Sequence, residues 1–202
     1  MAGRRERERM RHRQEILDAA GALLEERGPE GLTMDEVARR SEFAVGSIYR
    51  HFKSKDELVD AVIQNHLGPF FDEVQRLSSA EGSFEELFDA FLAAYARTVQ
   101  DTRPVWRALL LLRGEASDGL HAVMPALESM IGYFDALEAL IERGQADGVL
   151  IDEDPWVLVG AVHGMLEAFI KRSIFGLEVD FEAATRVVRF AVLRGFRAGE
   201  SS

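Results

Sequence analysis

Residues 43–55 combine side chains that suit contacts to the phosphates and bases of a nucleic acid. The stretch has three formal positive charges, one histidine and no acidic residue. It begins with a short helical pattern whose small and polar positions are Gly46, Ser47, Tyr49, Arg50 and His51. Small residues at the start of a helix let backbone N–H groups approach a phosphate closely. The residue types therefore predict a helix over residues 45–52 that reads DNA.

Two short helices must position these side chains. Thr33 and Glu36 have capping-box spacing, in which the threonine hydroxyl accepts the Glu36 N–H and the carboxylate reaches back. This pair predicts a helix over residues 34–40, ahead of the helix over residues 45–52. The apolar positions fall where two small helices crossing over a turn must touch, and they are Val37, Ala38, Phe43, Ile48 and Phe52. The pattern is typical of a helix-turn-helix.

The segments LTMDEVARRS, at 32–41, and GSIYRHFKSKDEL, at 46–58, lie on either side of a short turn. Together they resemble the DNA-binding domain of the TetR family of transcriptional regulators, and the similarity covers about residues 16–58. The resemblance implies phosphate contacts from Thr33, Tyr49, His51 and Lys55. It also implies that four residues lie toward bases or backbone, namely Val45, Gly46, Ser47 and Arg50.

Two positions depart from the family pattern. Glu42 stands where a glycine is usual in the turn, and a left-handed conformation there costs a non-glycine residue on the order of 1 kcal/mol. Ala44 stands where a serine usually caps the reading helix, a change worth roughly 0.5–2 kcal/mol in other helices. Both residues bear on the geometry of the turn rather than on its existence.

The N-terminal region is the basic part of an acidic protein. The 202-residue chain has a net formal charge of −11, with 24 lysines and arginines and 35 acids. Residues 1–55 hold 12 of the cations and 10 of the acids, which leaves 12 cations and 25 acids for the remainder. Salt screens charges more than about 8 Å apart at physiological ionic strength. The acidic remainder therefore does not prevent DNA binding.

Six arginines and two glutamates occupy the first 13 residues. We expect a flexible basic arm over residues 1–12, which either only solubilises the chain or tracks phosphate and enters the minor groove. A first helix over residues 13–27 should follow and end at Gly28-Pro29. We assign a helix-turn-helix DNA-binding domain to residues 13–57 and an effector-binding and dimerisation domain to residues 58–202.

The remainder of the chain also shows helical periodicity, without alternating runs of β-branched residues. A fourth helix should begin after Ser54 and be kinked or split by Pro69. Further helix starts are indicated at Ser83, Arg103-Pro104, Asp154-Pro155 and Asp180, and a long pattern covers residues 120–146. We therefore predict an all-α protein of about nine helices, with a three-helix helix-turn-helix domain followed by a larger helical domain.

The last two expected helices each carry a stripe of small residues. The stripes are Gly160, Gly164 and Ala168 in one helix, and Ala184, Val188, Ala191 and Gly195 in the other. A glycine inside a helix costs about 0.5–1 kcal/mol relative to alanine, so a close helix–helix contact is the expected compensation. That contact is either inside one chain or across a two-fold axis. The TetR resemblance implies a homodimer through these two helices.

The middle helices are rich in aromatic residues, most of which must be core. The TetR resemblance implies an apolar pocket for a small effector among them, and amphipathic rings suit a pocket lining. Our candidates are Tyr95, Trp106 and Phe134. The histidines are scattered, so no metal ligands are assigned, and the sequence indicates no cofactor.

Several classes of function are excluded or disfavoured by what the sequence lacks. There is no cysteine, which excludes disulfides and zinc–thiolate sites. We find no catalytic motif and assign no catalytic residue. No apolar run reaches 18 residues, so no membrane span is expected. We expect a cytoplasmic protein.

The sequence thus predicts a dimeric one-component transcriptional regulator, most simply a repressor. It would bind a palindromic DNA operator and be released by a small hydrophobic or aromatic effector. Two alternatives stay open at this point. One is a DNA-binding protein without an effector, and the other is a helical small-molecule binder or enzyme with a vestigial helix-turn-helix.

Overall fold

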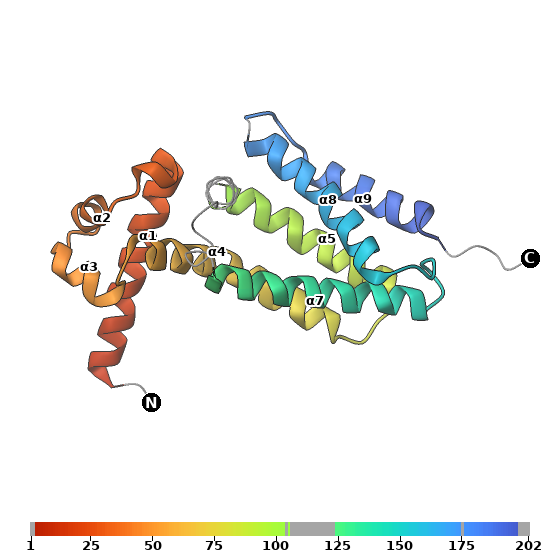
Figure 1. Cartoon of the computed structure of the whole chain (residues 1–202), viewed down its shortest axis with the longest axis horizontal. Coiled ribbons are helices and arrows are strands. Elements are labelled where there is room, and N and C mark those ends of the chain that lie inside the picture. The colour runs from red at the N-terminus through yellow and green to blue at the C-terminus, as the bar shows by residue number, and fades with distance from the viewer. Residues whose placement is uncertain (1–2, 104, 106–123, 175, 198–202) are drawn as a thin grey trace, which may run out of the picture. The chain divides into compact units, whose positions relative to one another are not determined.

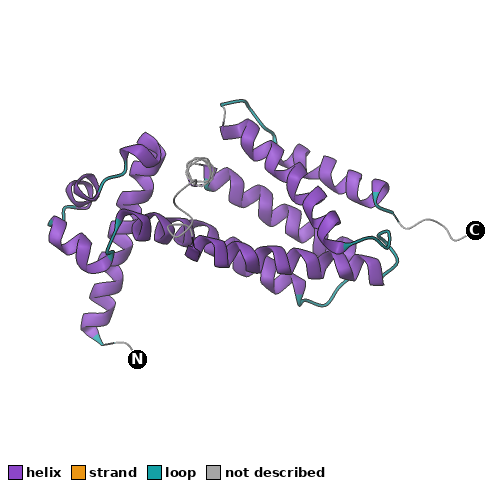
Figure 2. Ribbon diagram, viewed as in Figure 1, coloured by secondary structure: helices purple, strands orange, loops and turns teal. Residues whose placement is uncertain are grey.

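A computed structural model describes residues 3–103, 105, 124–174 and 176–197. At residues 29–30 and 124–130 only the backbone is described. Within these residues the chain forms eight α-helices and one isolated bridge between Leu150 and Arg197, and no strand (Figures 1 and 2). The all-α prediction is confirmed. Most of the short helix expected after Arg103 lies outside the described residues. No helix in the described part combines the length and hydropathy needed to cross a membrane.

The described residues divide into two compact units. The N-terminal unit contains residues 3–66, 105 and 124–127, and the C-terminal unit contains 67–103 and the described residues from 128 onward. The division between the units falls inside a helix, between His66 and Leu67. The functional domains expected from the sequence meet at 57/58, and that boundary stays a prediction.

The N-terminal unit is built from α1 (Arg4–Gly31), α2 (Met34–Ser41), α3 (Val45–His51) and the first half of α4 (Lys55–Ser78). Each helix contributes an apolar face to one small core. The core includes Ile16, Ala20, Leu23, Val37, Ile48, Phe52, Leu58 and Val62, all at most 1% exposed. The backbone of Gly28 is non-helical, with φ of 69° and ψ of −175°, so regular helix in α1 ends where the Gly28-Pro29 pair predicted.

The N-terminal arm is corrected by the structure. Residues 4–12 belong to α1, which starts at Arg4 and not at residue 13. The arginine-rich composition suggested a flexible arm, but the residues continue the helix that packs further along on the core. A helix can extend into solvent when its following turns are anchored, because each added residue then contributes one more backbone hydrogen bond.

The C-terminal unit comprises the second half of α4 with α5 (Phe84–Asp101), α7 (Met124–Ala146), α8 (Pro155–Ile174) and α9 (Phe181–Gly195). Ser83 and Glu86 form a complete capping box, and the Asp154 and Asp180 carboxylates accept backbone N–H groups at 2.9 Å. These predicted helix starts are confirmed. Helix α4 is continuous from Lys55 to Ser78 and contains Pro69 in its interior.

Candidate nucleic-acid interface

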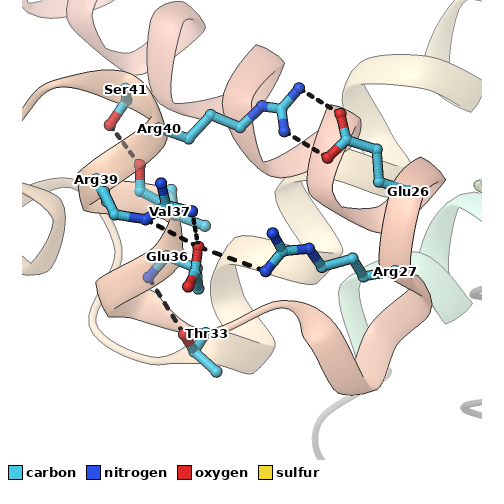
Figure 3. Close-up of polar contacts among 8 residues, drawn as sticks. All are labelled: Glu26, Arg27, Thr33, Glu36, Val37, Arg39, Arg40 and Ser41. Carbon is cyan, nitrogen blue, oxygen red and sulfur yellow. Dashed lines mark hydrogen bonds and ion pairs between the residues drawn. The ribbon is translucent and has the colours of Figure 1, made fainter.

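The start of α2 is fixed by Thr33, whose Oγ1 accepts the Glu36 N–H at 3.2 Å. The capping box is only half formed, because the Glu36 carboxylate does not reach back to the cap. It instead pairs with Arg39 and, at 3.6 Å, with Arg27 of α1 (Figure 3). The bond from Arg39 is the main cause that lowers the pKa of Glu36. The carboxylate therefore ties α2 to α1 rather than closing its own cap.

A second contact between these two helices fixes their crossing. The Arg40 guanidinium donates two hydrogen bonds of 2.6 Å to the two carboxylate oxygens of Glu26 (Figure 3). This bidentate geometry lowers the pKa of Glu26 and raises that of Arg40. Beneath the polar contacts, Val37 and Ala38 are buried, as the sequence predicted for a close crossing.

The turn between α2 and α3 contains the predicted left-handed residue. Glu42 has φ of 59° and ψ of 23°, and its N–H donates to the Ala38 carbonyl. The Phe43 N–H donates to the same oxygen at 3.1 Å. Ala44 is extended at the start of α3 and supplies no side-chain cap. Both departures from the family pattern are thus accommodated within an intact helix-turn-helix.

Helix α3 has one face in the core and one in solvent. Ile48 is fully buried, as is Phe52 at the helix end, whereas Tyr49 is 50% exposed and Arg50 is exposed. A Cβ placed on Gly46 would meet no atom within 4 Å. The Arg50 guanidinium donates to Ser47 Oγ at 2.6 Å. The small N-terminal residues and the polar ones predicted from the sequence are therefore brought together on the outward surface of a single helix.

Helix α1 adds contacts to α3 that sequence reasoning missed. The His12 ring lies 5.0 Å from the Phe43 ring, and the Arg13 guanidinium carbon lies 4.9 Å above the Phe52 ring. His51, at the end of α3, has a pKa lowered by burial and then by His12, Arg9 and other cations nearby. The missed signal is the four-residue spacing that places Arg9 and Arg13 on one face of a helix.

The start of α4 carries Lys55, which is half-buried. Ser54 Oγ accepts the Glu57 N–H at 3.1 Å, and Glu57 Oε2 accepts the Lys53 N–H at 2.7 Å. These reciprocal bonds hold the helix start as the sequence predicted.

Three other predicted contact residues lie on α2 and α3. Thr33 is exposed at the start of α2, and Val45 and His51 are half-buried at the two ends of α3.

The two stripes of small residues have different environments. Gly160, Gly164 and Ala168 are exposed on α8, and a Cβ on either glycine would meet nothing within 4 Å among the residues that the structure describes. Ala184 and Val188 are buried at 5% and 0% exposure in α9, which packs against α5 and α8. The stripe on α9 is corrected for these two residues, because they lie in the core of their own chain.

The rest of the α9 stripe is more accessible. Ala191 is half-buried and Gly195 is exposed. The large apolar side chains that α9 exposes are Val187 and Phe190, at 58% and 67%, and the first turn of α8 exposes Trp156 and Val157. Periodicity alone could not tell which of the two apolar faces of α9 would meet the core.

Two of the three predicted pocket residues lie among packed aromatics of the C-terminal unit. Tyr95 is 3% exposed, and its hydroxyl donates to the Leu166 carbonyl at 2.9 Å. Phe134 contacts the rings of Trp156 and His163, with centroid separations of 5.5 and 4.8 Å. Trp106 lies outside the described residues.

These features define an all-α protein in which the second helix of a helix-turn-helix presents an exposed face with Tyr49, Arg50 and small residues. Comparison with known proteins gives the same class. Residues 16–62 match the model of bacterial regulatory proteins, tetR family. Over 192 residues the chain is 27% identical to the HTH-type transcriptional repressor KstR2 of Rhodococcus jostii strain RHA1, covering 94% of this chain and 81% of that protein.

Solved structures share the fold over nearly the whole chain. The fatty acid degradation regulator FadR from Bacillus halodurans has a TM-score of 0.78 at 19% identity, covering 93% of this chain and 97% of that one. FadR from Bacillus subtilis, solved with stearoyl-CoA, gives 0.77 at 17% identity, with coverages of 91% and 99%. The chain is thus similar to TetR-family transcriptional regulators in sequence over residues 16–62 and in fold over nearly its whole length. The curated relatives it matches include HTH-type transcriptional repressors.

Proposed function

We propose that the protein is a homodimeric one-component repressor that binds a palindromic operator and leaves it when a small hydrophobic or aromatic effector binds. The observation that carries the proposal is the exposed face of α3, where Tyr49 and Arg50 stand opposite the buried Ile48 and Phe52. A helix anchored on one face and polar on the other can enter the major groove without losing its core contacts.

The homodimer follows from the outward faces of α8 and α9. Gly160 and Gly164 cost helix stability, and no described residue uses the space they leave. A second copy approaching closely along α8 would use it, and the exposed Val187 and Phe190 of α9 supply further apolar surface. Two reading helices related by a two-fold axis then match the two half-sites of a palindrome.

The effector site is proposed within the C-terminal unit, beside Tyr95 and Phe134. The support is the cluster of aromatic rings from α4, α5 and α7, in which Phe70 lies 6.2 Å from Tyr95 and 5.8 Å from Tyr133. The same fold accommodates stearoyl-CoA in FadR from Bacillus subtilis. An effector releases DNA only if it binds the state with mismatched reading helices more tightly than the operator-bound state.

The first test is binding of the purified protein to the DNA upstream of its own gene, at physiological salt and with excess random competitor. Competitor-resistant binding supports the regulator and supplies an assay for effectors that release the DNA. An effector that binds the protein but leaves operator affinity unchanged would contradict the proposed switch.

Substitutions separate the roles of the interface residues. Tyr49→Ala and Lys55→Ala should weaken binding to all sequences alike, and Lys55→Ala should reduce the slope of log K against log salt by about 1 per protomer, or about 2 for the proposed dimer. Changes at Val45 or Ser47 should alter the preferred sequence. Arg76→Ala, which removes one exposed charge from the C-terminal unit, is the control. Unchanged binding in all four interface variants would show that α3 is not the reading helix.

A further inference from the structure

We propose that the first three turns of α1 form a rigid, sequence-independent phosphate-binding element beside α3, with Arg5, Arg9 and Arg13 as its contacts. The proposal rests on the proposed DNA-binding function and extends the surface that performs it. It replaces the flexible arm expected from the sequence, because residues 4–12 are helical and continuous with the helix that supports the reading helix (Figure 1).

Helical spacing places the three arginines on the face of α1 that turns toward the core. Residues four apart lie one above the other on a helix. The row Arg5, Arg9 and Arg13 leads into Ile16 and Ala20, which are both fully buried in the N-terminal unit. The same face is therefore apolar where α1 covers the core and basic where it extends beyond it.

The contacts of His12 and Arg13 show which neighbour this basic face adjoins. His12 packs on Phe43 in the turn before α3, and Arg13 lies over the Phe52 ring at its end. Arg9 and Arg13 are both close enough to His51 of α3 to lower its pKa. The arginine row thus starts beside the reading helix. It extends about 12 Å further along α1, at 1.5 Å per residue from Arg13 to Arg5.

Acidic residues do not cancel this row. Glu6 pairs with Arg9 at 3.0 Å, but both side chains remain well exposed, at 48% and 67%. Such a surface pair contributes little to stability and can be exchanged for a phosphate contact. Glu8 lies toward the opposite face, which also carries Arg4 and Arg11, and Arg11 is paired with Glu15 at 3.5 Å.

A helix in this position contacts the sugar-phosphate backbone and supplies affinity rather than base recognition. Each phosphate neutralised by a cation releases condensed counterions, and the salt dependence of binding reports their number. The arginine row should therefore strengthen binding to the operator and to random duplex DNA by similar factors. It should also steepen the salt dependence for both.

The test compares two double variants of the full-length protein that remove equal charge from opposite faces of α1. Arg5→Gln with Arg9→Gln changes the proposed row, and Arg4→Gln with Arg11→Gln changes the other face. Each removes one arginine that has an acidic partner on α1, and glutamine has a helix propensity close to that of arginine. Affinity for operator and random duplex is measured from 50 to 300 mM salt.

The row variant should bind both duplexes more weakly and lower the salt slope by about 1.8 per protomer, or about 3.6 for the proposed dimer, at about 0.9 per phosphate contact. The opposite-face variant should stay near the parent protein. Arg5→Lys with Arg9→Lys keeps the charge and should keep the parent slope. A row variant that matches the parent, equal losses on both faces, or a reduced slope in the lysine variant would each overturn the proposal.

Failure of the proposed function has a different signature. It is seen in the parent protein, which would then not prefer its operator over random duplex. The effect of the arginine row is measured on random duplex as well. The proposal for the arginine row can therefore be wrong while the protein still prefers its operator. It can also be right while the protein shows no such preference.

Discussion

Glu42 is the residue at which the helix-turn-helix departs furthest from an unstrained backbone. In the described residues it is the one non-glycine position with positive φ, at 59°. Its side chain is exposed, and the hydrogen bond that matters at this position is the one from its backbone N–H to Ala38. The left-handed conformation therefore carries a steric cost at Cβ that the Glu42 side chain does not offset.

Replacing this residue by glycine should stabilise the protein. Removing the Cβ relieves the left-handed strain, and the gain after the larger unfolded-state entropy of glycine should be about 1 kcal/mol in the free energy of unfolding. Urea denaturation of Glu42→Gly measures it, with Glu42→Ala as the control because alanine keeps the Cβ. Equal stability of the two variants would contradict a strained turn.

Asp60 is a buried carboxyl in the first half of α4, with 8% of its surface exposed. Burial raises its pKa to about 6, and the charge of Asp56 adds to the effect. The carboxyl of an unfolded chain titrates near pH 4. Between about pH 4 and 6 the folded protein therefore holds a proton that the unfolded chain has released. The free energy of unfolding falls as the pH rises through this window.

Asp60→Asn should remove this dependence, because asparagine is uncharged at every pH. We expect the variant to be more stable than the parent at pH 7.5, by on the order of 1 kcal/mol, and the difference to disappear below about pH 4. Thermal or urea denaturation from pH 4 to 8 gives the measurement. Asp72→Asn, exposed on the same helix, should show no such pH-dependent gain. An unchanged pH profile in Asp60→Asn would exclude Asp60 as its source.

At the scale of helices, the sequence predicted best what depends on neighbours three or four residues away. Ser83, Asp154 and Asp180 cap the helices that follow them, and Thr33 accepts the N–H that its spacing indicated. These contacts are local, so residue type and spacing largely determine them. The carboxylate of Glu36 does not reach back to the cap, because Arg39 in the same helix and Arg27 in another helix both compete for it.

The partner that a helix face meets is harder to predict from the sequence. The small residues of α9 predicted a close contact either inside the chain or across a two-fold axis, and Ala184 and Val188 are buried inside the chain. The arginines of residues 4–12 predicted solvent exposure, and these side chains are exposed. They also predicted a flexible arm, but the segment is helical. Charge and size tell how a side chain is solvated, whereas the tertiary fold decides what lies across from it.

At the scale of the whole molecule, the outward faces of α8 and α9 remain to be accounted for. Trp156, Val157, Val187 and Phe190 are each more than half exposed in one chain. Scattered exposed apolar residues are ordinary, but Trp156 and Val157 share α8 with two glycines whose Cβ position meets no atom within 4 Å among the described residues. Covering this face with a second copy explains both features together. It also gives the dimer that a palindromic operator needs.

Phe190→Glu should therefore convert the protein to a monomer without unfolding it, because the ring has 67% of its surface exposed and contributes little to the core. Sedimentation velocity at micromolar concentration measures the mass, and operator binding should weaken far more than binding to random duplex, since two linked half-site contacts become one. Leu177→Glu, half exposed in the segment between α8 and α9, adds the same charge elsewhere and should leave the dimer intact. If Phe190→Glu stayed dimeric, the chains would have to meet through another surface, and Gly160 and Gly164 would need a different explanation.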